Sequence, residues 1–146
     1  MTEIAKKIYI KQVGTVFVPV VDQDRALAFY LDKLGFEKRA DFPYGNGSRW
    51  IEVVPLGAAN TISLVPPSEG KSAGGGETHC AFTTEDIEAD DTALQALGVD
   101  VDAKIARKGS RRSGLISIDA NIPDPVPSQF FFRDIDGNRF LIVQPD

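Results

Sequence analysis

Two side chains of this sequence, His79 and Glu52, have the chemistry for metal-free acid–base catalysis. His79 is the only histidine among the 146 residues, and an imidazole is the commonest general base in proteins. Glu52 would orient it, provided that the two side chains come within hydrogen-bond reach. The single cysteine, Cys80, falls by strand alternation on the side that a helix covers, where a thiol is an inert apolar group. Whether His79 and Glu52 meet depends on the elements that carry them.

These elements occur twice along the chain, as two imperfect copies of one unit. In the first copy an apolar strand over residues 15–21 precedes a helix that begins at Asp22 and ends at Gly35. In the second copy a strand over residues 79–84 precedes a helix from Asp86 to Gly98. A further strand and a β-hairpin complete each copy. These are predicted over residues 36–42, 49–54 and 60–65, and over residues 99–106, 129–133 and 138–143.

A β-α-β-β-β unit used twice predicts an α+β fold of two small sheets, each with one face under its helix and one face open. Two such sheets that curl towards one another form a cleft, either within one chain or between the chains of a dimer. We expect a single domain over residues 1–146. It consists of a module over 8–67 and a module over 77–146, joined by a glycine-rich linker over 68–76.

Three segments carry a resemblance to a known superfamily: VPVVDQDRALAFYLDKLGF, HCAFTTEDIEADDTALQALGV and FFFRDIDGNRFLIVQP. They resemble the vicinal oxygen chelate superfamily, which includes glyoxalase I, bleomycin-resistance proteins, fosfomycin-resistance enzymes and extradiol dioxygenases. The resemblance implies the paired-module fold and a homodimer. It does not imply one activity, because members catalyse several reactions and some only bind a ligand.

The resemblance also implies where a metal would be held. Superfamily metalloenzymes bind a divalent ion near the start of the first strand and the end of the last hairpin of each half. The internal repeat places these positions at Thr15, Ser63, His79 and Leu141. Only His79 is a good ligand for zinc, nickel or iron, whereas a catalytic site normally has about three protein ligands. We therefore expect no metal cofactor and neither glyoxalase I nor dioxygenase activity of the usual kind.

Strand alternation selects the side chains that line the predicted cleft. If residues 54 and 61 face one another in the first hairpin, Glu52 pairs with Ser63, and the resemblance places Ser63 on the cleft side. Trp50 and Thr61 then share that side, while Ile51, Val53, Ile62 and Leu64 pack under the helix. On the first strand of each module, Thr15 and Phe17, and His79 and Ala81, face the cleft. The expected ligand-binding residues are Thr15, Phe17, Trp50, Glu52, Ser63, His79 and Leu141.

This lining suits a flat or amphipathic small organic molecule, stacked on Trp50 and Phe17 and oriented by His79 and Glu52. We expect a metal-independent binder, like the drug-sequestering members of the superfamily. Two alternatives stay open: a glyoxalase-like lyase or isomerase that uses His79 and Glu52, and an interaction module whose cleft is vestigial. Trp50 could equally be a core residue without a ligand.

Composition and charge indicate a small cytoplasmic domain. The net charge of −5 argues against general nucleic-acid binding, although Arg107, Lys108, Arg111 and Arg112 cluster near an irregular segment over residues 108–128. That segment is either a binding loop or a solvated loop, with room for a short strand over 114–118. One cysteine permits no internal disulfide, and no stretch approaches a membrane span. The segment DIDGN over 134–138 is expected to be a hairpin turn.

Overall fold

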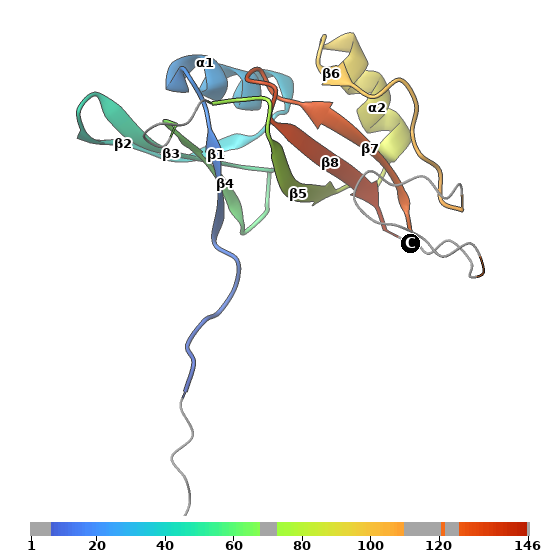
Figure 1. The fold of residues 1–146 in the computed structure, drawn as a ribbon, viewed down its shortest axis with the longest axis horizontal. Helices are drawn as coiled ribbons and strands as arrows, with labels where there is room; N and C mark the ends of the chain where they lie inside the picture. Colours follow the sequence, from blue (N-terminus) through green and yellow to red (C-terminus); the bar gives the residue numbers. More distant parts are fainter. Residues whose placement is uncertain (1–6, 68–72, 110–120, 122–125, 146) are drawn as a thin grey trace, which may run out of the picture.

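The computed structural model of the protein describes residues 7–67, 73–109, 121 and 126–145. The described residues form two four-stranded sheets, one from each half of the chain (Figure 1). The strand orders are β1-β4-β3-β2 and β5-β8-β7-β6, and in both sheets the first strand runs parallel to the last strand of its half. The repeated unit and the α+β fold predicted from the sequence are therefore confirmed.

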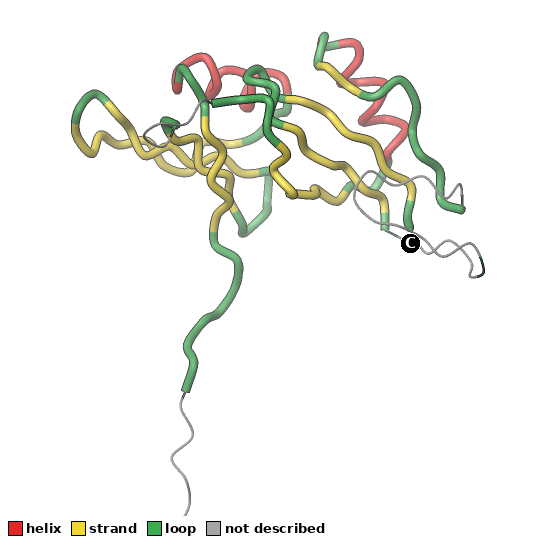
Figure 2. Tube along the Cα trace, viewed as in Figure 1, coloured by secondary structure: helices red, strands yellow, loops and turns green. Residues whose placement is uncertain are grey.

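The elements follow the predicted order (Figure 2). The first half contains β1 (Thr15–Pro19), α1 (Gln23–Ala28), η1 (Phe29–Lys33), β2 (Glu37–Gly45), β3 (Ser48–Val54) and β4 (Thr61–Val65). The second half contains β5 (Glu77–Thr83), α2 (Ile87–Ala96), β6 (Asp100–Val101), β7 (Ser128–Arg133) and β8 (Arg139–Gln144).

Both helices begin at the predicted aspartates. The Asp22 carboxylate accepts a hydrogen bond from the Arg25 N–H (3.1 Å), and the Asp86 carboxylate accepts one from the Ala89 N–H (3.0 Å). Gly35 and Gly98 follow the helices with φ of 71° and 78°, which is the left-handed conformation that glycine adopts at low cost. The π-helical turn η1, which continues α1, was not predicted, because hydrophobic periodicity does not distinguish it from an α-helix.

The strand after α2 is shorter than predicted. The sequence predicted a strand over 99–106, but β6 covers two residues, and beyond it only Ala106 forms an isolated bridge, with Gln129. Asp102 explains the difference. Its carboxylate accepts hydrogen bonds from the Phe131 N–H (3.1 Å) and the Arg133 guanidinium (3.0 Å), so a side chain replaces the backbone partner that a longer strand would supply.

A single hydrophobic core connects the two modules. The predicted buried set of Ile51, Val53, Ile62 and Leu64 lies in the same cluster as Phe130, Phe132, Phe140 and Ile142 of the second sheet. Tyr30 of η1 contacts Phe140 edge to face (6.3 Å between ring centroids), and Phe36 contacts Phe82 (5.5 Å). The Tyr30 hydroxyl donates to the buried Asp134 carboxylate (2.7 Å). The helical side of the first module is thus packed against the second module.

The DIDGN segment forms the predicted turn and also makes contacts between modules. Gly137 has φ of 83° and its N–H donates to the Asp134 carbonyl (3.0 Å). The Asn138 amide donates to the Pro19 carbonyl (3.0 Å), and the Asp136 carboxylate accepts from the Val21 N–H (3.1 Å). The turn therefore holds the end of β1 as well as closing its own hairpin.

Part of the expected linker is packed against this turn. Gly74, with φ of 84°, lies so close to Asp136 that a Cβ at this position would be 2.0 Å from the Asp136 carbonyl oxygen. The Gly75 N–H donates to the same oxygen (3.0 Å). Residues 68–72, the possible strand over 114–118, Arg111 and Arg112 lie outside the described residues. In the described part of the chain, no helix is long and apolar enough to cross a membrane.

Candidate functional site

A hydrogen-bonded polar cluster lies on the open face of the first sheet. Glu52 on β3 pairs with Ser63 on β4, and Ser63 pairs with Phe17 on β1, so the predicted register is confirmed. The Trp50 indole N–H donates to one oxygen of the Glu52 carboxylate (2.6 Å), and the Thr61 hydroxyl donates to the other (2.8 Å). The carboxylate is therefore held at both oxygens before any ligand is present.

A second pair of hydroxyls completes this cluster. The Thr15 and Ser63 hydroxyl oxygens are 2.6 Å apart and share a hydrogen bond, and Thr15 also contacts the Thr61 carbonyl oxygen (3.1 Å). Ser63 is fully buried, with 0% of its surface exposed. Both hydroxyls therefore have hydrogen-bond partners, as polar groups at a buried position require.

Aromatic side chains lie on the same face of the sheet as this hydrogen-bonded cluster. The Phe17 ring meets Trp50 edge to face, with 5.7 Å between centroids and 81° between planes. Phe42 on β2 pairs with Trp50 across the strands, so its side chain projects from the same face. Phe17 and Phe42 are 60% and 52% exposed, whereas Trp50 and Glu52 are half-buried. Trp50 is not among the residues of the hydrophobic core, which argues against a purely structural role.

Phe42 is a residue of this face that the sequence analysis did not select. Alternation along β2, combined with its pairing to β3, would have placed residue 42 beside Trp50. The two strands join through a tight turn at Asn46 and Gly47, both with positive φ, which was not used to set the register. The sequence therefore contained the information needed to place Phe42 on this face.

The sequence neighbour Glu77, and not this cluster, supplies the hydrogen-bond partner of His79. The ladder between β5 and β8 is irregular between Glu77 and Ala81, and His79 has φ of 56°, a left-handed conformation that is uncommon for histidine. Its side chain is exposed, and its N–H donates to the Glu77 carboxylate (3.2 Å). Within the described residues no hydrogen bond or ion pair joins His79 to Glu52. The structure thus brings Glu52 together with Trp50, but not with His79.

Leu141 lies on the second sheet between Ala81 and Phe131 and is buried. Beside it, the Arg139 guanidinium lies 3.7 Å from the centre of the Phe131 ring and pairs with the Glu77 carboxylate. Cys80, the other residue considered for chemistry, packs against the core as predicted, and burial raises the pKa of its thiol. A raised thiol pKa disfavours the reactive thiolate.

The four positions at which the superfamily holds a metal do not fit one here. Thr15 and Ser63 are hydroxyls that bond to each other, Leu141 has no donor atom, and His79 alone is a strong ligand. Among the described residues there is no group of three or more His, Cys, Asp or Glu side chains that could hold a metal ion. No metal-dependent step is therefore derived for this chain.

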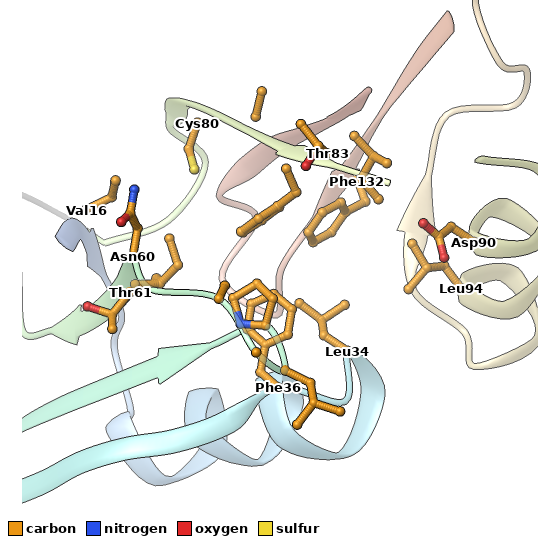
Figure 3. A pocket seen from close by; sticks show the side chains of 18 of the residues that line it. Val16, Leu34, Phe36, Asn60, Thr61, Cys80, Thr83, Asp90, Leu94 and Phe132 are labelled. Atoms are coloured by element: carbon orange, nitrogen blue, oxygen red, sulfur yellow. The ribbon is translucent and has the colours of Figure 1, made fainter. Parts of the chain in front are cut away.

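A groove lies between the modules and was not predicted. Its volume is about 900 Å³. Figure 3 shows Leu34 and Phe36 of the first module facing Phe132 and Leu94 of the second across this space. The polar residues Asn60, Thr61, Thr83 and Asp90 also border it. Predicting this groove requires the relative placement of the two modules, which strand alternation does not supply.

The fold and the two tandem modules place the chain in a defined family. A model of the Glyoxalase/Bleomycin resistance protein/Dioxygenase superfamily matches residues 12–142, and the chain belongs to this superfamily. The expected relationship to the vicinal oxygen chelate proteins is thereby confirmed.

Several known proteins are similar to this chain in structure or in sequence. TnmS3, an antibiotic binding protein from Streptomyces sp. CB03234, has a similar structure (TM-score 0.74, 31% identity, 96% of this chain and 100% of that chain covered). A superfamily member from Sphaerobacter thermophilus DSM 20745 is also similar (TM-score 0.77, 28% identity, 94% and 100% covered). In sequence, the uncharacterized protein YetH of Bacillus subtilis (strain 168) is 36% identical over 91 residues, which cover 62% of this chain and 76% of YetH.

Proposed function

We propose that this chain binds a flat small organic molecule on the open face of its first sheet, without a metal, and so sequesters a drug or metabolite. The observation that carries the proposal is the cluster of Trp50, Phe17, Thr61 and Glu52, in which two rings in edge-to-face contact lie beside a carboxylate that accepts two hydrogen bonds. Because the side chains of this face are already held in place, little conformational entropy is lost when a ligand binds. The similarity to TnmS3, an antibiotic binding protein, supports the same class of function.

The alternative, a glyoxalase-like lyase or isomerase, is less well supported. It requires His79 and Glu52 to act together, but the two Glu52 oxygens accept hydrogen bonds from Trp50 and Thr61. In the part of the chain that the structure describes, no hydrogen bond joins His79 to Glu52. Catalytic contacts sometimes form only with substrate present. Turnover of a glyoxalase-type substrate that is lost in His79→Ala would establish the enzyme and contradict the binder.

Binding can be followed through Trp50, because it is the only tryptophan of the chain. A planar polycyclic compound should change its fluorescence, and Phe17→Ala should weaken binding by about tenfold through loss of a stacking contact. Leu56→Ala is the matched control, because Leu56 is an exposed apolar residue that borders the groove between modules. If Leu56→Ala weakens binding and Phe17→Ala does not, the ligand occupies the groove and the proposed location is wrong.

We also propose that the protein acts as a homodimer in the cytoplasm, as the sequence analysis expected. In support, Phe17 and Phe42 on the binding face remain more than half exposed, and a second chain could cover them. The segment before β1 extends away from the body (Figure 1), and its apolar residues Ile8, Tyr9, Ile10 and Val13 are 64–86% exposed.

Sedimentation equilibrium tests the dimer. A mass about twice the 15.9 kDa of the chain is expected, and Ile8→Lys/Ile10→Lys should shift the equilibrium towards monomer. A wild-type protein that stays monomeric at every concentration would contradict the proposal.

A further inference from the structure

The unpaired charge of Glu52 is the feature of the binding face that bears on ligand chemistry. Glu52 is half-buried, and its hydrogen bonds come from Trp50 and Thr61, which are both neutral. No ion pair in the described part of the chain includes Glu52. A partly desolvated carboxylate without a cation is an unfavourable arrangement that a positively charged ligand would relieve.

The basic residue nearest along the strand does not supply that cation. The Arg49 guanidinium is bonded to the Asp24 carboxylate (2.6 Å) and the Asp41 carboxylate (3.0 Å). These carboxylates, Asp41 first, raise the pKa of Arg49 above its ordinary range, whereas the Arg49 guanidinium lowers the pKa of Asp41. Arg49 is therefore committed to its own ion pairs, and the charge of Glu52 is left for another partner.

The aromatic rings around Glu52 favour the same kind of ligand. The negative face of an aromatic ring attracts a cation within about 6 Å of its centre, and indole does so best. The bond from the Trp50 N–H to Glu52 fixes the indole beside the carboxylate, and the nearly perpendicular Phe17 ring gives a corner of two ring surfaces. A flat cation can stack on one ring, contact the other and place its charge towards Glu52.

We propose that the ligand of this face is a flat organic cation, with Glu52 as the residue that selects its charge. This inference rests on the proposed function, because it assigns the ligand class of the same face. A neutral ligand could use Glu52 only as a hydrogen-bond acceptor. The test must therefore separate charge from hydrogen bonding.

Three probes of nearly equal size and shape make this separation. N-Methylacridinium is a cation without an N–H, acridone is neutral with an N–H, and N-methylacridone is neutral without one. Equilibrium dialysis gives the dissociation constants, because a cationic dye can quench Trp50 by collision without binding. The wild-type protein should bind the cation about tenfold more tightly than either neutral ring, the ratio expected for a partly buried charge contact with an aromatic face.

Variants assign this preference to Glu52. Glu52→Gln keeps one acceptor oxygen for the Trp50 N–H, and its NH2 group can donate to the Thr61 hydroxyl, so it removes the charge but leaves both neighbours with a hydrogen-bond partner. It should reduce the preference for the cation to about twofold or less. Glu52→Asp retains the charge and should retain a preference, which excludes a general effect of misfolding. Glu85→Gln removes one acid from an exposed position before α2 and should leave the ratio unchanged.

The outcomes distinguish the two proposals. Equal binding of all three rings, or acridone binding as tightly as the cation, would overturn the ligand class and leave the binding function intact. No binding of any ring would contradict the proposed function itself. A preference for the cation that persists in Glu52→Gln would overturn the role of Glu52.

Discussion

Replacing Tyr30 with phenylalanine should weaken the connection between the two modules by an amount that can be worked out. Tyr30 and Asp134 are both buried, and their side chains lie 104 residues apart in sequence but 2.7 Å apart in space. A hydrogen bond to a charged group contributes about 1.5–3 kcal/mol. The Asp134 carboxylate keeps its bonds from the Asp136 N–H, the Asn138 N–H and the Asn138 amide in the variant.

The lower part of that range therefore applies, and we expect Tyr30→Phe to reduce the free energy of unfolding by about 2 kcal/mol. For a chain of 146 residues, an unfolding entropy of about 2.1 cal/mol/K per residue converts this to a fall in Tm of about 6 °C. Urea unfolding followed by circular dichroism measures the free energy. Tyr44→Phe is the control, because Tyr44 is an exposed tyrosine, and its change should stay within about 0.5 kcal/mol.

The same residue predicts a loss of stability in alkali. Burial, followed by the charge of Asp134, raises the pKa of Tyr30 well above its ordinary value. The folded protein holds the phenolic proton more tightly than the unfolded chain does. This contribution is complete below the unfolded pKa near 10 and is lost as the pH rises through the folded pKa. The difference in stability between wild type and Tyr30→Phe should therefore shrink above about pH 10. A change below about 0.5 kcal/mol at neutral pH, together with parallel curves in alkali, would refute this account of the contact.

Two further predictions concern the metal positions and the packed glycine. Protein purified without a chelator should contain less than about a tenth of an equivalent of divalent metal by elemental analysis, and Thr15→His/Leu141→Glu should recover metal; near-stoichiometric metal in the wild type would show that the ligands were misplaced. Gly74→Ala should destabilise the protein by more than about 2 kcal/mol, because its Cβ would overlap the Asp136 carbonyl. Gly57→Ala, at φ of 81° but with no atom within 4 Å, should cost only about 1–2 kcal/mol of backbone strain, so equal losses would contradict the overlap.

The parts of the fold that follow local rules could be predicted from the sequence. The helices begin where Asp22 and Asp86 cap them, and the first hairpin pairs Glu52 with Ser63. The register was predictable because a slip of one residue would have exposed an entirely aliphatic set of side chains. The positions of Glu52 and Ser63 on the open face followed from that register.

The packing of one module against the other could not be predicted in the same way. It depends on Tyr30 meeting Asp134 and on Phe36 meeting Phe82, which are contacts between residues far apart in sequence. In the sequence, Asp134 was sufficiently explained as a turn residue, and nothing local distinguishes a turn aspartate from one that also binds a buried tyrosine. The groove between the modules is a consequence of this packing and was missed with it.

The contribution of the second module to the site could not be predicted by alternation, for a different reason. Alternation assumes a regular ladder, but β5 has five residues from Glu77 to Ala81 where β8 has three from Arg139 to Leu141. His79 falls within this irregular stretch, so counting by twos cannot assign the direction of its side chain. The prediction that His79 shares a site with Glu52 depended on that count.

These two outcomes together explain why binding is assigned to the first sheet. At two of the positions where related metalloenzymes place ligands, Thr15 and Ser63 share a hydrogen bond and Thr15 also donates to the Thr61 carbonyl, so both hydroxyls have protein partners. The second module offers one strong donor, His79, in an irregular strand. In the proposed binder, affinity comes from ring contacts and from the unpaired Glu52 charge, and both lie within three adjacent strands of one sheet. Because the helical side of the first module packs against the second module of its own chain, the open face is left for the ligand, and in the proposed dimer a second chain would cover it.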